Sequence, residues 1–133
     1  MALQNKGIAF DTSMLLEIGR NKIDVFSELK KMFGKAEFIV PEQVVSELKM
    51  LEGRKGKGKM QAGIALMVLD ANKAERKKVE AKNADSALLK LAKQGFVVAT
   101  NDAGLRKSIK NVAGSVIYLR KGAFLVFEGE TDV

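Results

Sequence analysis

Residues 8–13 read Ile-Ala-Phe-Asp-Thr-Ser, a short apolar run that ends in polar side chains. The helical spacing of Met14, Leu15 and Ile18 follows it, so the stretch predicts a buried strand that feeds a helix. Residues 96–102, Phe-Val-Val-Ala-Thr-Asn-Asp, repeat the arrangement ahead of a basic helix. Two strands of this kind indicate a parallel sheet with aspartates at its carboxyl edge.

The rest of the chain alternates in the same way. Helices are expected over residues 23–33, 41–51, 60–73 and 83–94, and strands over residues 37–40, around Val79, over 116–119 and at 124–127. Because parallel neighbours require crossover helices, the alternation predicts a single-domain three-layer α/β/α sandwich with a mostly parallel central sheet. Residues 1–133 are expected to form this one domain, with residues 128–133 as a flexible tail.

The composition excludes most hydrolytic mechanisms. The 133 residues contain no histidine and no cysteine, which removes the commonest general base, thiolate nucleophiles and cysteine-bound zinc. Hydrophobic residues make up 47% and charged residues 29%, as in a packed globular domain. No apolar run suits a membrane span and the N-terminus lacks a secretory signal, so we expect a cytoplasmic protein without membrane contact.

The basic residues suggest a polyanionic partner, since a formal net charge of +7 favours nucleic acid or another anionic surface. Within residues 53–59, lysine and arginine alternate with glycine and predict a flexible loop that contacts nucleic-acid phosphates or serves only as a solubilising linker. A second basic segment follows Asp102 and either positions a nucleic-acid backbone or is ordinary helix surface. The candidate nucleic-acid-binding residues are Arg54, Lys55, Lys57 and Lys59 in the first segment and Arg106 and Lys107 in the second.

Four acidic residues lie at strand ends or next to the apolar side of a helix, where a charged side chain is unusual. Asp11 and Asp102 each follow a strand, where an acid can bind a ligand or cap the next helix. At about 100° per residue, Glu47 borders the apolar stripe of its helix, and Asp85 lies on the side that carries Leu88 and should face the core. Glu47 is also open to a reading as a snorkelling or lysine-paired side chain.

If these carboxylates converge, their repulsion requires a proton or a cation. Two unit charges about 4 Å apart repel by roughly 4 kcal/mol at an effective dielectric of about 20. Oxygen ligands with room for water suit Mg²⁺ or Mn²⁺, and one or two such ions can activate water for phosphodiester hydrolysis. Acid–base chemistry by lysine or carboxylates alone also stays open. The predicted catalytic and metal-binding residues are Asp11, Glu47, Asp85 and Asp102.

The order and spacing of these segments resemble the PIN-domain ribonucleases over nearly the whole chain. The resemblance rests on the strand end with Asp11, the helix with Glu47, residues 83–89 (Asn-Ala-Asp-Ser-Ala-Leu-Leu) and residues 97–102 (Val-Val-Ala-Thr-Asn-Asp). It implies a PIN-like parallel sheet that gathers the four acids at one edge, and an endoribonuclease that depends on Mg²⁺ or Mn²⁺. The supporting polar residues that it implies are Ser13, Thr100 and Asn101.

Several readings of this resemblance remain. Residues 99–107 and 117–120 look more like the archaeal and eukaryotic branch that processes ribosomal RNA, which implies a pre-ribosomal substrate. A ribonuclease toxin of the VapC kind has the same acidic positions and adds an antitoxin partner. A non-catalytic RNA-binding or assembly module with the same fold is a further alternative, and a homodimer is compatible with each. An aspartyl-phosphate phosphatase is disfavoured because Ser13 stands where a second aspartate is needed.

Overall fold

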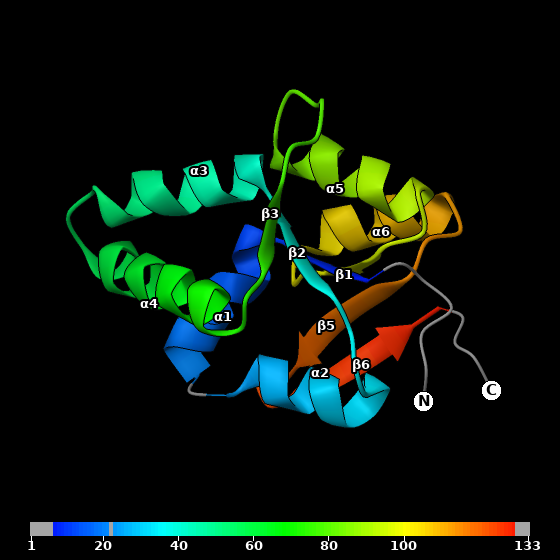
Figure 1. The fold of residues 1–133 in the computed structure, drawn as a ribbon, viewed down its shortest axis with the longest axis horizontal. Helices are drawn as coiled ribbons and strands as arrows, with labels where there is room; N and C mark the ends of the chain where they lie inside the picture. Colours follow the sequence, from blue (N-terminus) through cyan, green and yellow to red (C-terminus); the bar gives the residue numbers. More distant parts are fainter. Residues whose placement is uncertain (1–6, 22, 130–133) are drawn as a thin grey trace.

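Strands and helices alternate along most of the chain. The computed structural model describes residues 7–21 and 23–129. The strands are β1 (Ile8–Phe10), β2 (Phe38–Pro41), β3 (Glu75–Lys77), β4 (Val97–Ala99), β5 (Val116–Arg120) and β6 (Phe124–Glu128). The helices are α1 (Thr12–Asn21), α2 (Val25–Phe33), α3 (Glu42–Glu52), α4 (Lys57–Ala71), α5 (Ala84–Lys93) and α6 (Ala103–Asn111). Helices α3 and α4 pack together at one end of the molecule, and α5 and α6 pack together at the other (Figure 1).

The six strands of the described residues form one sheet in the order β3-β2-β1-β4-β5-β6. The first five strands in this order run parallel to one another, and β6 runs antiparallel to β5. The register places Phe10 opposite Ala99, and the backbone N–H of Asp11 donates to the carbonyl of Ala99 over 2.9 Å. The carboxyl ends of β1 and β4 therefore lie side by side, where ligands of open α/β sheets bind.

Helices cover both faces of the sheet, which confirms the predicted three-layer α/β/α sandwich. Every residue of β1, β2 and β4 is buried, although consecutive side chains on a strand point to opposite faces. On one face Phe10, Phe26 and Phe38 pack with ring centroids 4.7, 4.8 and 5.7 Å apart. Each aromatic pair adds about 0.5–1.5 kcal/mol to the effect of burial. The cluster ties α2 to β1 and β2 and so fixes the strand that leads to the first aspartate.

Helix α4 begins earlier than the sequence predicts. Gly56, with a φ of 113°, precedes its first residue, so Lys57 and Lys59 belong to a helix and the prediction of a flexible loop is wrong for them. The helix packs against both α1 and α3. A Cβ on Gly19 of α1 would stand only 3.2 Å from the Cα of Gln61. This close packing outweighs the low helix propensity of a glycine-rich segment.

The edge strand expected around Val79 lies a little earlier in the chain. β3 spans Glu75–Lys77 and pairs in parallel with β2. Val79 follows it in the connection to α5, where its carbonyl accepts a hydrogen bond of 2.6 Å from the side chain of Gln43. A side-chain amide therefore takes the place of a strand partner at this position.

The chain continues as a strand further than expected. Glu128, predicted to begin a flexible tail, is the last residue of β6 and lies opposite Val116. A turn at Lys121 and Gly122, whose φ angles are 56° and 66°, returns the chain against β5 with the twist that hairpins favour. The prediction is thus wrong for Glu128, and residues 130–133 lie outside the described residues.

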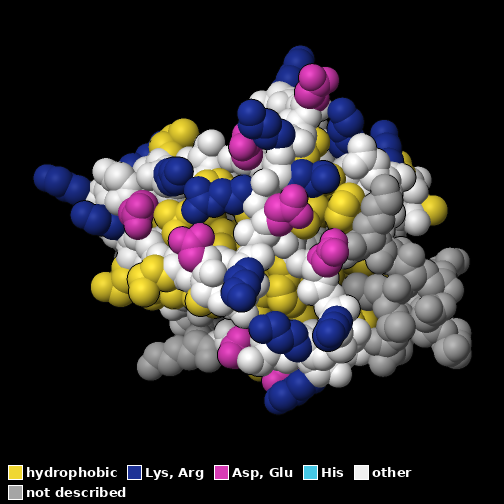
Figure 2. All heavy atoms as spheres, viewed as in Figure 1, with side chains coloured by type: hydrophobic (Ala, Val, Ile, Leu, Met, Phe, Trp, Pro, Cys, Tyr) yellow, Lys and Arg dark blue, Asp and Glu magenta, His cyan; other side chains and the backbone are white. Residues whose placement is uncertain are grey.

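The surface carries charges of both signs. Figure 2 shows lysine and arginine side chains spread among aspartates and glutamates on one face, with hydrophobic side chains exposed over α4. Met60 and Met67 of this helix are 73% and 72% exposed. Among the described helices, none is long and apolar enough to cross a membrane.

Candidate active site

Asp11 is the buried centre of the site, because it follows β1 at the carboxyl edge of the sheet and is only 5% exposed. Its carboxylate accepts hydrogen bonds from the backbone N–H of Thr12 at 2.8 Å, the Ser13 hydroxyl at 2.8 Å and the Thr100 hydroxyl at 2.6 Å. Three donors compensate a buried charge that would otherwise cost several kcal/mol. Since Thr12 is the first residue of α1, the capping role considered for Asp11 is correct in part.

Ser13 and Thr100 join the ends of the two central strands. Their hydroxyl oxygens lie 3.1 Å apart, and both hydroxyls donate to Asp11. The Ser13 oxygen also accepts the backbone N–H of Asn101 at 3.0 Å, and the Thr100 oxygen accepts that of Asp102 at 3.1 Å. The segment after β4 is therefore fixed to the segment after β1 through side chains that converge on one carboxylate.

The side chain of Asn101 serves the sheet and not the acids. Its oxygen accepts the backbone N–H of Leu119 in β5 at 2.9 Å. This hydrogen bond continues the β4–β5 ladder beyond the Ala99–Ile117 pair. Of the three supporting residues expected from the sequence, the structure brings Ser13 and Thr100 to Asp11, whereas Asn101 contributes its backbone.

Glu47 reaches the site from α3. Its side chain is exposed, and one carboxylate oxygen accepts a hydrogen bond of 2.6 Å from the Thr12 hydroxyl. Thr12 therefore offers its backbone N–H to Asp11 and its hydroxyl to Glu47, which links two of the four acids. Sequence reasoning did not select Thr12, although its place in the polar end of the first strand was a usable signal.

Asp85 lies in the first turn of α5 and is exposed, so the prediction that it faces the core is wrong. The helix does bury Ala84, Ala87 and Leu88, as the periodicity requires. Side chains on a helix lean toward its N-terminus, and in the first turn this direction carries them past the end of the packed layer. Asp85 is therefore directed out of the core at the edge where the other acids lie.

The four acids act on one another electrostatically. Partial desolvation raises the pKa of the Asp85 carboxyl most, and the charges of Asp11, Asp102 and Glu47 raise this pKa further, in that order. Such repulsion acts between charged groups that lie near one another. Among the described residues, no lysine or arginine forms an ion pair with any of the four. The fold thus gathers negative side chains, and the part of the chain that the structure describes supplies them with no ion-paired cation.

Asp102 caps α6 and shares a cleft with Asp85. One of its carboxylate oxygens accepts the backbone N–H of Leu105 at 3.0 Å, so the capping alternative is correct for this residue. Asp85 and Asp102 both line a cleft of about 330 Å³ bordered by α5 and α6. A cap engages one carboxylate oxygen and leaves the other able to bind a ligand in that cleft.

The donor set suits a hard divalent ion, although its members are not drawn together into a finished site. Nowhere in residues 7–21 and 23–129 do three acidic side chains stand where they could hold an ion without moving. Asp11 is fixed by its three donors, whereas Glu47, Asp85 and Asp102 are exposed, and each makes one side-chain hydrogen bond or none within the described part of the chain. Oxygen ligands with unbalanced negative charge fit Mg²⁺ or Mn²⁺, whose charge would offset the repulsion among the acids.

Asn83 is the N-cap of α5 and holds the start of this helix, and thereby the position of Asp85. Its side-chain oxygen accepts the N–H of Ser86 at 2.9 Å, and the Ser86 hydroxyl oxygen accepts the N–H of Asn83 at 3.2 Å. We expect Asn83→Ala to lower the free energy of unfolding in urea by about 1 kcal/mol, because it removes this capping box. Asn111→Ala, at the exposed end of α6, should change it by less than about 0.5 kcal/mol, and equal losses would refute the capping role.

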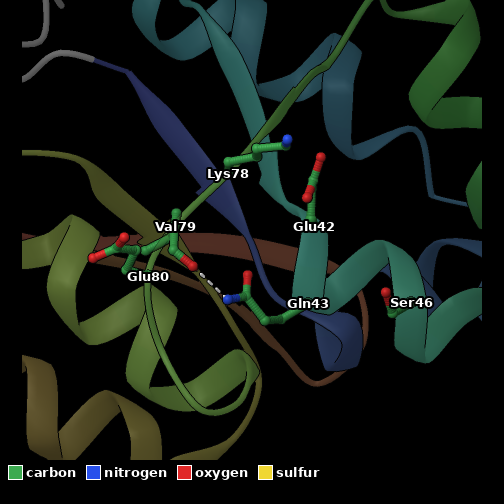
Figure 3. Close-up of a pocket in the computed structure, with 6 residues that line it drawn as sticks. All are labelled: Glu42, Gln43, Ser46, Lys78, Val79 and Glu80. Carbon is green, nitrogen blue, oxygen red and sulfur yellow. Dashed lines mark hydrogen bonds between the residues drawn. The ribbon is translucent and has the colours of Figure 1, made fainter.

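A second cleft opens about one turn from Glu47 along α3. It measures about 490 Å³ and is lined by Glu42, Gln43, Ser46, Lys78, Val79 and Glu80 (Figure 3). Figure 3 shows Gln43 reaching from α3 to the segment after β3, where its amide donates to the carbonyls of Val79 at 2.6 Å and Ala81 at 3.2 Å. Gln43, which sequence reasoning missed, therefore sets the connection to α5 against the helix that carries Glu47.

The first group of basic candidates lies away from the acids. Arg54 and Lys55 are exposed in the turn after α3, and Lys59 is exposed in the first turn of α4. The side chain of Lys57 lies outside the described part of the structure. In Figure 1 the α3–α4 turn stands at the opposite end of the molecule from α5 and α6. These residues are therefore not brought to the carboxylate cluster.

The second group adjoins the acids through a shared helix. Arg106 lies one turn after Asp102 on α6, and Lys107 beside it is exposed. The guanidinium carbon of Arg106 stands 4.1 Å from the centre of the Tyr118 ring, so stacking fixes its position. This group is the better placed of the two to contact a polyanion bound at the acids.

Comparisons with known proteins agree with this arrangement. A family model described as a PIN like domain matches residues 8–122, which include both central strand ends and all four acids. Ribonuclease VapC9 of Archaeoglobus fulgidus is 33% identical over 113 residues, which cover 84% of this chain and 81% of that protein. Since the family model matches residues 8–122 and the similarity to VapC9 extends over most of both chains, this chain belongs to the PIN-like domain family.

Proposed function

We propose that the protein is a metal-dependent endoribonuclease of the VapC type. The observation that carries the proposal is the carboxylate cluster at the sheet edge, where Asp85 experiences the charges of three other acids and no described lysine or arginine pairs with them. Similarity to Ribonuclease VapC9 supports the same chemistry. An acidic site without its own counter-charge is suited to bring a cation together with a polyanionic substrate.

Asp11, Glu47, Asp85 and Asp102 would hold one or two Mg²⁺ or Mn²⁺ ions in this proposal. When bound, such an ion supplies an activated water and neutralises charge that develops on phosphodiester oxygens. The raised pKa of Asp85 comes from desolvation and from the charges of the other three acids, and a bound cation would relieve that repulsion. The exposure of Asp85 at the mouth of the cleft leaves it accessible to substrate.

The hydroxyl groups of the site position ligands in this scheme and do not react. Ser13 and Thr100 hold the Asp11 carboxylate in one orientation, and Thr12 holds Glu47. A ligand that is already oriented loses less conformational freedom when an ion or substrate binds. The buried half of the site, Asp11 with its donors Ser13 and Thr100, is thus preorganised, whereas the exposed acids adjust when a ligand binds.

RNA is the proposed substrate, and the net charge of +7 would draw it to the protein. Arg106 and Lys107 would contact the strand close to the acids. Arg54, Lys55 and Lys59 would contact RNA only where the strand extends to the α3–α4 end of the molecule. A stretch of RNA long enough to reach both groups is therefore expected to bind more tightly than a short one.

The similarity favours the toxin alternative over processing of ribosomal RNA. The resemblance of residues 99–107 and 117–120 to the ribosomal branch receives no support from the comparisons, and neither does a pre-ribosomal substrate, whereas the curated relative carries the VapC name. An antitoxin partner, a cytoplasmic location and a homodimer belong to this proposal. A non-catalytic RNA-binding module is disfavoured because it has no need for unpaired carboxylates at one site.

RNA cleavage in the presence and absence of divalent ions tests the proposal. The purified protein should cut a single-stranded RNA, labelled at one end, at internal positions in Mn²⁺ or Mg²⁺, because water attack depends on the ion. An excess of chelator should abolish the products, and restoring Mn²⁺ should recover them. Undiminished cleavage in chelator, or no cleavage in either ion, would overturn the proposed function.

A further inference from the structure

A pocket of about 370 Å³ lies on the opposite side of α6 from the cleft that Asp85 and Asp102 share. It is lined by Ala103, Arg106, Lys107 and Lys110 of α6, Tyr118 of β5 and Glu128 of β6. The spacing of the four α6 residues places them on one face of the helix. The pocket begins at the residue after Asp102 and follows α6 for about 10 Å. It is therefore a mostly basic pocket whose first lining residue, Ala103, directly follows Asp102 in the chain.

The guanidinium of Arg106 is held in place, and one of its donors has no partner among the described residues. It stacks on the Tyr118 ring at 4.1 Å, and its Nε is buried without a hydrogen-bond partner among the described residues. A stacked guanidinium presents several donors in a fixed plane, which suits the oxygens of a phosphate. Arg106 is thus prepared to bind an anion.

Glu128 supplies this pocket with a negative charge from the chain itself. Its carboxylate accepts the Tyr118 hydroxyl hydrogen at 2.9 Å and forms an ion pair with Lys110. The contacts with Lys110 and Tyr118, and the charges of Lys110 and Arg106, hold the pKa of Glu128 below its usual value, although desolvation opposes the shift. The pocket therefore already stabilises one anion.

We propose that this pocket is a subsite for a backbone phosphate of RNA, and that Glu128 occupies it until the RNA displaces the carboxylate. The inference rests on the proposed function, because a strand whose scissile phosphate lies at the acids can continue along α6. A backbone phosphate carries the same single negative charge as a carboxylate and has two non-bridging oxygens that can accept hydrogen bonds from Arg106, Lys107 and Lys110. Because Glu128 belongs to the same chain, it competes at a high effective concentration and lowers the affinity for RNA.

Glu128→Gln tests this competition, since glutamine keeps the size of the side chain and removes its charge. Binding of a fluorescent single-stranded RNA is measured in excess chelator, so that the RNA stays intact. At about 0.1 M salt the variant should bind about threefold to tenfold more tightly than the wild type. One additional phosphate contact should also steepen the slope of the logarithm of the RNA association constant against the logarithm of the salt concentration by about 0.7.

Glu28→Gln is the matched control, because Glu28 forms an exposed ion pair of 3.4 Å with Lys31 on α2. It changes the net charge by the same amount at a residue that does not line the pocket, and its affinity for RNA should stay within about twofold of the wild type. Equal affinities for Glu128→Gln and Glu28→Gln would overturn the inference, because the gain would then be an effect of total charge.

Two further variants connect the gain to the pocket. Tyr118→Phe keeps the ring beneath Arg106 and removes one hydrogen bond to Glu128, so RNA should bind more tightly, though by less than in Glu128→Gln. Adding Lys110→Gln to Glu128→Gln should return the affinity close to that of the wild type, because the released cation is removed. Thermal unfolding verifies that each variant is folded. A gain that survives the loss of Lys110 would overturn the inference.

Two further comparisons separate free phosphate from RNA as the ligand of the pocket, and separate this subsite from the proposed nuclease activity. If Glu128→Gln strengthens protection by inorganic phosphate against thermal unfolding but leaves RNA affinity unchanged, the pocket binds a free anion and the RNA assignment is overturned. Cleavage in Mn²⁺ is assayed in parallel. If the protein cleaves RNA but Glu128→Gln does not raise the affinity for RNA, the subsite alone is refuted. If Glu128→Gln raises the affinity but the protein does not cleave RNA, the proposed nuclease is refuted and the subsite is supported as an RNA contact.

Discussion

Replacing Asp85 with asparagine should reduce Mn²⁺-dependent RNA cleavage by about a thousandfold, which corresponds to about 4 kcal/mol of transition-state stabilisation. Asparagine has the shape of aspartate but neither the charge that holds a divalent ion nor the capacity to accept a proton. Asp85 is exposed and forms no ion pair among the described residues, so the fold should survive the change. Initial cleavage rates of an end-labelled single-stranded RNA measure the loss.

Asp70→Asn is the matched control for this substitution. Asp70 is an exposed aspartate on α4 that pairs with Arg76 at 3.4 Å, so its replacement changes the net charge equally. This variant should retain cleavage within about twofold, because surface ion pairs contribute little. Mn²⁺ should raise the melting temperatures of the wild type and of Asp70→Asn equally, and raise that of Asp85→Asn much less. Undiminished cleavage by folded Asp85→Asn would remove Asp85 from the site.

The strands that carry the site could be predicted because their sequences leave few alternatives. Residues 8–10 and 97–99 are continuous apolar runs, and a run of that length fits a strand buried on both faces. Polar residues follow each run directly, so Asp11 and Thr100 are expected at the sheet edge. The local pattern therefore indicates which side chains meet before the strand order is known.

The direction of Asp85 could not be read from periodicity alone. Its angular position relative to Leu88 correctly identifies the buried side of α5, but periodicity does not show where along the helix the packed layer ends. Contacts between distant segments are equally hidden, as the hydrogen bond from Thr12 to Glu47 illustrates. Such pairs depend on how α1 and α3 pack, and nothing in either segment specifies the partner.

The errors at the ends of elements also have a tertiary cause. Lys57 begins α4 because that helix packs on α1 and α3, which a local reading of glycine and lysine does not detect. Glu128 stays in β6 because β5, Tyr118 and Lys110 hold it. In both places, contacts with other helices and strands outweigh a weak local preference for a loop or a flexible tail.

Thr100→Val should lower the free energy of unfolding by about 2 kcal/mol, a fall in melting temperature of about 8 °C for a chain of this length. Valine has nearly the shape of threonine, so no cavity forms, but the buried Asp11 carboxylate loses its hydrogen bond of 2.6 Å. The backbone N–H of Asp102 loses its acceptor as well. Urea denaturation, followed by circular dichroism, measures the loss.

Thr12→Val makes the same chemical change beside an exposed acid. Its hydroxyl donates to Glu47, which water can solvate in its place, so the free energy of unfolding should fall by less than about 0.5 kcal/mol. The difference between the two variants reports how far Asp11 depends on the protein for its donors. If the two variants lost the same free energy of unfolding, the hydroxyl donor of the buried Asp11 would contribute no more to stability than the donor of the exposed Glu47. The preorganised half of the proposed site would then have no energetic basis.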